Sequence, residues 1–157
     1  MKRLFFIISA ILLLLQLNTR AQTTPKDTIF SRGKLINANF TGKVWVQQLV
    51  AQDSVFNLVV GAVTFSPGAR SYWHTHNAGQ ILMVLDGVGY TQEKGKPVRI
   101  IHKGEVIICP PNVEHWHGAA PGSSMVQLSL NTYADKGVVN WLRPVTDAEY
   151  NGPTGNK

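Results

Sequence analysis

Short apolar stretches alternate with polar turns over most of this 157-residue chain. The turns are rich in glycine, proline and charged residues, as in Ser66-Pro67-Gly68, Lys103-Gly104 and Pro121-Gly122-Ser123. Short stretches bounded in this way are typical of β-strands joined by tight connections. The expected strands are Val44–Val46, Phe56–Phe65, Gln80–Leu85, Val88–Gln92, Pro97–His102, Val106–Cys109 and Ser124–Asn131. The sequence therefore predicts an all-β sandwich or barrel.

Two local signals refine this picture. Asp86-Gly87 lies between two expected strands and predicts a tight hairpin, because both residues tolerate the left-handed backbone that such turns need. Thr146–Tyr150 is the one segment expected to be helical, as a short terminal turn with Thr146 as its N-cap.

The N-terminus predicts a secretory signal peptide. Lys2 and Arg3 precede the apolar run Leu4–Leu15, and Thr19-Arg20-Ala21 supplies small residues for cleavage before Gln22. The alternative is a membrane anchor, but the run is about a dozen residues long, against roughly 20 needed to span. We therefore expect residues 1–21 to be removed and the protein to be periplasmic or secreted, without membrane attachment. Residues 22–157 are long enough for one domain.

The basic charge of the chain lies partly in this peptide. Removing residues 1–21 takes away Lys2, Arg3 and Arg20, so 15 basic and 9 acidic residues become 12 and 9, and the net charge falls from +6 to +3. The remaining charges are scattered, which argues against nucleic acid as a partner. Cys109, the single cysteine, cannot form an intramolecular disulfide and is expected to be buried.

Two segments carry most of the candidate chemistry. The first is Gly68-x5-His74-x-His76-x3-Gln80-x6-Gly87, and the second is Gly104-x5-Pro110-x-Asn112-x2-His115. Residues two apart on a strand face the same side, so His74 and His76 converge, and Gln80 joins them along a continuous strand or after a turn. A Pro110-Pro111-Asn112 turn sends the next strand, with His115, back across the sheet. Three imidazoles and one carboxamide predict a divalent-metal site. Gln80 alternatively serves as a hydrogen-bonding neighbour of the ligands.

These segments resemble the two signature motifs of the cupin superfamily. The resemblance implies a small antiparallel β-barrel of jelly-roll type, with its core at about residues 57–132 of a single cupin domain. It also implies that His74, His76, Gln80 and His115 hold one metal ion inside the barrel. The chain departs from the usual motifs at Gln80, where glutamate is commonest, at Asn112, where glycine is usual, and at Ala119, where asparagine is usual.

The flanking residues narrow the resemblance. Trp73-His74-Thr75-His76, Gly79-Gln80, His115-Trp116-His117-Gly118-Ala119-Ala120-Pro121 and Val139-Asn140-Trp141 are similar to small bacterial cupins. These include manganese-dependent hydroxynitrile lyases and cupin domains associated with carboxymuconolactone decarboxylases. The resemblance implies a manganese cofactor, with zinc, iron or nickel as further metals that fit, a small-molecule substrate and a homo-oligomer, either dimer or tetramer.

Further polar residues are candidates for the same cavity. His117 shares strand parity with His115 and is either a proton carrier in the cavity or a rim residue that supports the ligands. Gln127, Ser129 and Asn131 alternate with apolar residues, so they face either a substrate pocket or solvent. Gln127 is the second catalytic candidate, whereas Ser129 and Asn131 are pocket candidates. His102 lies outside both motifs and is expected at the surface.

A neutral donor set has a chemical consequence. With three histidines and Gln80, a divalent ion keeps its full charge, which strengthens Lewis acidity and disfavours higher oxidation states. We therefore expect a metal-dependent lyase that polarises a small hydroxy or carbonyl compound, by resemblance through cyanohydrin cleavage. A non-catalytic module that binds a small ligand and a dioxygenase are the alternatives.

Overall fold

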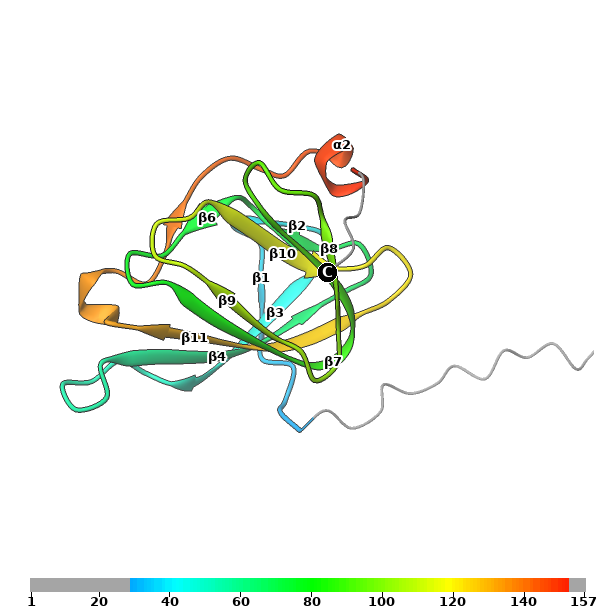
Figure 1. The fold of residues 1–157 in the computed structure, drawn as a ribbon. Coiled ribbons are helices and arrows are strands. Elements are labelled where there is room, and N and C mark those ends of the chain that lie inside the picture. Colours follow the sequence, from blue (N-terminus) through cyan, green and yellow to red (C-terminus); the bar gives the residue numbers. More distant parts are fainter. Residues whose placement is uncertain (1–28, 153–157) are drawn as a thin grey trace, which may run out of the picture.

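The computed structural model describes residues 29–152, and in this range the chain forms a nearly closed antiparallel β-barrel (Figure 1). The expected signal peptide lies outside the described residues. The strands are β1 (Lys34–Ile36), β2 (Phe40–Thr41), β3 (Val44–Val50), β4 (Leu58–Phe65), β5 (Arg70–Ser71), β6 (His74–Thr75), β7 (Gln80–Glu93), β8 (Arg99–His102), β9 (Val106–Cys109), β10 (His115–Ala119), β11 (Met125–Thr132) and β12 (Asn140–Trp141). A 3₁₀ turn, η1 (Ala134–Lys136), and one helical turn, α2 (Asp147–Tyr150), complete the described elements.

Two curved sheets face each other and share strand β7. One sheet has the order β1-β3-β4-β11-β7-β9, and the other contains β2, β5, β10, the second half of β7, and β8. Strands β6 and β12 extend the second sheet through β10. All pairings are antiparallel, so the all-β expectation is confirmed.

The hairpin expected at Asp86-Gly87 is wrong. Strand β7 runs unbroken from Gln80 to Glu93 and passes from one sheet to the other at this point. Gly87 has a φ of 79°, and the register of β11 against β7 shifts between Val126 and Gln127. The shift leaves Leu85 without a partner on β11, so a bulge lies next to the left-handed Gly87 and the one long strand bends here. A bend of this kind has the same local sequence signal as a hairpin.

The other expected strands are present, with shifted ends. Strand β3 continues to Val50, whereas β4 begins at Leu58 and β8 at Arg99. Thr146 caps α2 as expected, since its side chain accepts a hydrogen bond from the Glu149 backbone N–H. The short strands β1, β2, β5 and β12 were not expected, because two or three residues carry no detectable alternation.

Apolar side chains fill two regions of the barrel. The larger cluster lies between the sheets and includes Phe65, Leu82, Ile101 and Met125. The smaller one lies beneath the C-terminal segment and contains Trp73, Val98, Trp116, Val145 and Tyr150. Among the described residues, no helix is long and apolar enough to cross a membrane.

Candidate metal centre

Four histidines converge inside the barrel from two neighbouring strands. His74 lies on β6, His76 follows directly after it, and His115 and His117 lie on β10. Strands β6 and β10 pair with His115 opposite His74, so the ring centroids of these two histidines lie only 4.3 Å apart. All four side chains are at most 5% exposed. The cluster is therefore created by the pairing of two short strands.

Backbone carbonyl groups fix the orientation of three of these rings. The Nδ1–H of His74 donates to Tyr72 at 2.8 Å, that of His115 donates to Val113 at 2.9 Å, and that of His76 donates to Val138. A neutral imidazole with Nδ1 protonated presents its lone pair at Nε2. Burial lowers the pKa of each of these histidines, that of His76 to about 4, so the rings are neutral near pH 7. Each ring thus offers one unprotonated Nε2.

Gln80 is held with its oxygen toward these nitrogens. Its amide Nε2 donates to Ser129 Oγ at 2.9 Å and to Asn131 Oδ1 at 3.2 Å. The amide Oε1 consequently lies 3.3 Å from His115 Nε2. Because the proton of His115 is already used at Nδ1, this contact brings two acceptors together. Two facing lone pairs in a buried site are repulsive unless a cation satisfies both.

The surroundings of His76 also fit a bound cation. Its Nε2 is buried and has no hydrogen-bond partner in the described structure. Buried imidazole nitrogens normally have a partner, and a metal ion is one that fits this donor set. The residues at hand therefore fit a divalent metal held by nitrogen and amide oxygen.

Three histidines could hold a metal ion together. Ring nitrogens of His74, His115 and His117 lie within 4.8 Å of one another. The three histidines expected from the sequence are His74, His76 and His115, so this group has His117 in place of His76. Both sets share His74 and His115, so His76 and His117 are the residues that distinguish them.

His117 differs from the other three histidines in its hydrogen bonding. Its Nδ1 lies 3.0 Å from Gln127 Nε2, and no carbonyl group holds it. Burial and the three neighbouring histidines lower the pKa of His117 well below its usual value. Gln127 is fully buried, and its Oε1 has no partner among the described residues. Rotation of the Gln127 amide by 180° would exchange its NH₂ donor and its oxygen acceptor. Gln127 can therefore hydrogen-bond to Nδ1 in either neutral tautomer of His117.

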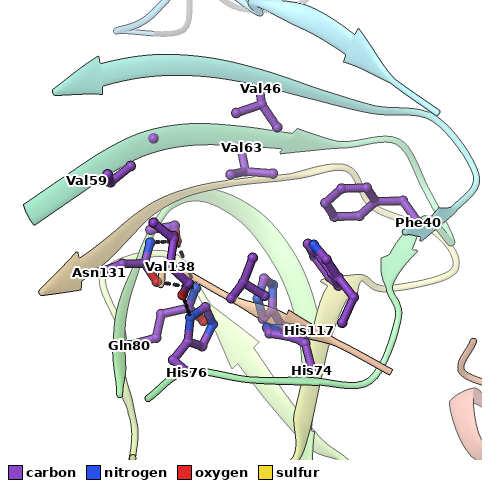
Figure 2. Close-up of a pocket in the computed structure, with 14 residues that line it drawn as sticks. Phe40, Val46, Val59, Val63, His74, His76, Gln80, His117, Asn131 and Val138 are labelled. Atoms are coloured by element: carbon purple, nitrogen blue, oxygen red, sulfur yellow. Dashed lines mark hydrogen bonds between the residues drawn. The ribbon is translucent and has the colours of Figure 1, made fainter. Parts of the chain in front are cut away.

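A cavity of about 200 Å³ opens beside the histidines (Figure 2). His74, His76, Gln80 and His117 form its polar wall together with Ser129 and Asn131. The other lining residues are apolar, namely Phe40, Val46, Val59, Val63, Val138, Val139 and Trp141 around Gly61. The polar face of β11 therefore points inward, whereas Gln127 lies behind the wall against His117.

The structure also separates some residues from the site. His102 is exposed at the end of β8, as expected. Cys109 is buried opposite Gln80 in the β7–β9 pair, and burial raises the pKa of its thiol to about 12. This thiol is therefore an apolar packing group.

The C-terminal segment contacts the histidines, which the sequence did not predict. Strand β12 pairs with β6, which brings Trp141 to 5.1 Å from His74 and to 5.5 Å from Phe40, measured between ring centroids. The carbonyl group of Val138 holds His76. The apolar pair Val138-Val139 beside Trp141 was the available signal, but nothing local showed what it covers.

A small antiparallel barrel that buries histidines beside a cavity defines a class of jelly-roll proteins with an internal candidate metal site. A family model described as a cupin domain matches residues 61–131. A relative named (R)-mandelonitrile lyase, from Granulicella tundricola, is 46% identical over 113 residues, which are 71% of this chain and 85% of the relative. The chain belongs to the cupin family.

Solved structures agree with this assignment. A cupin-like protein from Thermotoga maritima MSB8 is 49% identical, with a TM-score of 0.78 over 83% of this chain and 100% of that chain. A polyketide cyclase from Streptomyces resistomycificus, 16% identical, has a TM-score of 0.59 over 80% of this chain and 91% of its own. This second likeness concerns the fold alone.

Proposed function

We propose that this protein is an exported metal-dependent lyase that cleaves a small cyanohydrin into an aldehyde and hydrogen cyanide. His74, His76, Gln80 and His115 are the proposed ligands, and manganese is the proposed metal. The observation that carries the proposal is a neutral donor set facing a half-apolar cavity. The choice of reaction is supported by the 46% identical relative named (R)-mandelonitrile lyase.

The donor set favours polarisation of an oxygen atom. No acidic side chain is among the described residues that line the cavity. A divalent metal bound there supplies Lewis acidity toward a substrate oxygen. Such a site lowers the pKa of a hydroxyl group without any change of oxidation state, which is what cyanohydrin cleavage requires.

His117 is the proposed proton carrier. In the cleavage, the hydroxyl proton of the substrate passes to the free ring nitrogen of His117, and the O–H electron pair forms the carbonyl group. The bond between the carbinol carbon and the nitrile carbon breaks, and its electron pair leaves with cyanide. His117 returns its proton to cyanide, so hydrogen cyanide and an aldehyde leave a regenerated imidazole. Gln127 supports this role because it can accept from or donate to Nδ1.

The cavity walls suit a small substrate with two unlike ends. Ser129 and Asn131 lie beside the proposed ligand Gln80 and can hydrogen-bond to a hydroxyl or nitrile group. Phe40 and Trp141 form an edge-to-face pair that lines the cavity and can contact an aromatic ring. An aromatic cyanohydrin would place its polar carbon among the histidines.

Cyanide release from mandelonitrile tests the proposal. Manganese-loaded protein should release cyanide faster than chelated protein at mildly acidic pH, where the uncatalysed background is low, and added Mn²⁺ should restore the rate. His117→Ala should lower the rate by about 10²-fold or more, a typical loss for a proton carrier. His102→Ala, an exposed histidine on β8, is the matched control and should leave the rate unchanged.

Equal rates in loaded and chelated protein would reject the lyase function. Mandelonitrile that binds without turnover would then favour a metal-dependent binding module. Oxygen consumption during turnover would instead favour a dioxygenase.

A further inference from the structure

A short segment near the C-terminus forms part of the cavity wall beside the histidines. We call residues 136–141 the strap. The carbonyl group of Val138 accepts a hydrogen bond from His76, and Figure 2 shows the two residues next to each other. Strand β12, at the end of the strap, pairs with β6, with Trp141 opposite His74. Three side chains of the strap line the cavity, namely those of Val138, Val139 and Trp141.

The orientation of His76 depends on the strap, whereas the orientations of His74 and His115 depend on their own segments. The carbonyl groups that accept from His74 and His115 belong to residues only two positions earlier in the chain. The carbonyl group that accepts from His76 belongs to Val138, 62 positions away. Local backbone geometry keeps a neighbour two residues away in place, but a distant partner stays in place only while its own segment is held.

The strap therefore influences the nitrogen that His76 offers to a cation. This nitrogen, Nε2, is buried and has no hydrogen-bond partner in the described structure. The two ring nitrogens of His76 thus face different partners, since Nδ1 faces the strap and Nε2 is left for the metal. A histidine whose second nitrogen donates to a fixed carbonyl group is a stronger and better oriented metal ligand.

Asn77, the next residue after His76, holds the strap on both sides of Val138. Its Nδ2 donates to the carbonyl oxygen of Lys136 at 2.6 Å. Its Oδ1 accepts from Asn140 Nδ2 at 2.8 Å. One carboxamide therefore fixes the strap two residues before and two residues after the carbonyl group that orients His76.

The chain beyond the strap is secured by other contacts. The Leu142 N–H donates to the Trp73 carbonyl group at 2.8 Å, and the Trp73 N–H donates to the Arg143 carbonyl group at 3.0 Å. Val145 and Tyr150 are buried in the smaller apolar cluster. Asn77 itself is exposed and is not among the residues that line the cavity. Loss of its side chain should consequently loosen the strap without opening the barrel.

We propose that Asn77 is a positioning residue of the metal centre, which holds the strap so that Val138 orients His76 and thereby raises the affinity for a divalent ion. This coupling is reciprocal by linkage, so a bound ion holds the strap in place to the same extent that the held strap favours the ion. The inference rests on the proposed ligand set and does not depend on the proposed reaction.

Titration of chelator-treated protein with Mn²⁺ tests the first half of the coupling. Asn77→Ala should raise the Kd for Mn²⁺ by at least about fivefold, the lower end of typical couplings between sites. Asn140→Ala removes one of the two contacts from the side of the strap and should raise the Kd by at least about twofold. The matched control is Asn151→Ala, at an exposed asparagine directly after α2, which should keep the Kd of the wild type.

Hydrogen exchange tests the reciprocal half, and a merely structural role of Asn77 would not affect it. In the wild type, Mn²⁺ should slow exchange of the strap amides by at least about fivefold, whereas the amides of α2 should exchange at the same rate with and without the ion.

Three results would overturn the proposal. The first is a Kd that is unchanged in both Asn77→Ala and Asn140→Ala. The second is exchange in the strap that does not respond to Mn²⁺. The third is a wild type that binds no Mn²⁺, which would reject the proposed metal and its site as well. Tight Mn²⁺ binding without cyanide release would reject only the proposed reaction, and the fivefold rise in Kd for Asn77→Ala would then still support the role of Asn77.

Discussion

Three backbone carbonyl groups decide which nitrogen each of the proposed ligand histidines offers. Tyr72, Val113 and Val138 accept the Nδ1 protons, so the Nε2 atoms of His74, His115 and His76 are left for a cation. A carbonyl partner fixes both the tautomer and the ring orientation, which is the usual role of groups around metal ligands. His117 lacks such a partner and contacts an amide that can reverse. The hydrogen bonds therefore favour His76 over His117 as the third ligand.

Metal content distinguishes the two possible ligand sets. His76→Ala should lower bound metal well below one ion per chain, whereas His117→Ala should leave about one ion per chain, since only His76 has an orphaned Nε2. Elemental analysis after gel filtration measures this. His74→Ala and His115→Ala should lose metal under either set, and His102→Ala should retain it. Loss in His117→Ala with retention in His76→Ala would show that the ligands are His74, His115 and His117.

At the scale of elements, the long strand β7 ties the two sheets together. Its first half begins with Gln80 and pairs with β9 and β11, and its second half pairs with β8 and β10, which carries His115 and His117. One continuous strand therefore sets the position of the carboxamide relative to two histidines. The bend at Gly87 is what allows it to serve both sheets.

Substitution of Gly87 should destabilise the fold severely. A Cβ at this position would collide with the Ser124 carbonyl oxygen, and the φ of 79° is itself unfavourable for alanine. We expect Gly87→Ala to lower the free energy of unfolding by about 3 kcal/mol or more, from strain and overpacking together. Urea unfolding measures this. Gly95→Ala is the control, because Gly95 has a φ of 80° but open space at its Cβ, and it should cost only about 1 kcal/mol. Equal costs would show that the collision is relieved without strain.

At the scale of the whole molecule, the barrel encloses four imidazoles that resist protonation. Burial lowers the pKa of His74, His76, His115 and His117, and mutual repulsion among these histidines adds to the effect at His74, His76 and His117. Unfolding releases each of them to an ordinary pKa of 6.5. Below this pH the unfolded chain binds protons that the folded chain does not, so stability falls as the pH falls.

Metal-free protein should therefore lose stability in mild acid. Between pH 6.5 and about 4, His76 alone contributes a loss of about 3 kcal/mol in the free energy of unfolding, since its pKa falls to about 4 in the fold. The stabilisation is complete above pH 6.5. Urea unfolding in the presence of a chelator measures the slope. His76→Asn should flatten it, whereas His102→Ala should not. The Glu149 carboxyl group, with its pKa lowered to about 2, contributes only below about pH 4.5 and does not interfere.

The sequence by itself determined the fold class, the two segments whose histidines and Gln80 come together, and the cap at Thr146. These depend on local properties, namely residue types, short spacings and turn chemistry. Asn112, for example, has the left-handed φ of 62° that its turn requires. Such preferences act over a few residues and are visible without knowing what surrounds them.

Only the tertiary structure decided the features that depend on distant partners. Whether Asp86-Gly87 makes a hairpin or a bend within one strand depends on how β11 pairs with β7. Whether Gln127, Ser129 and Asn131 face a cavity or water depends on which side of β11 the second sheet covers. The contacts of Val138 with His76 and of Trp141 with His74 join segments more than 60 residues apart. Local preferences allow each of these segments more than one conformation or orientation. Packing against distant segments selects one of them, and in this protein the selected arrangement shapes the cavity.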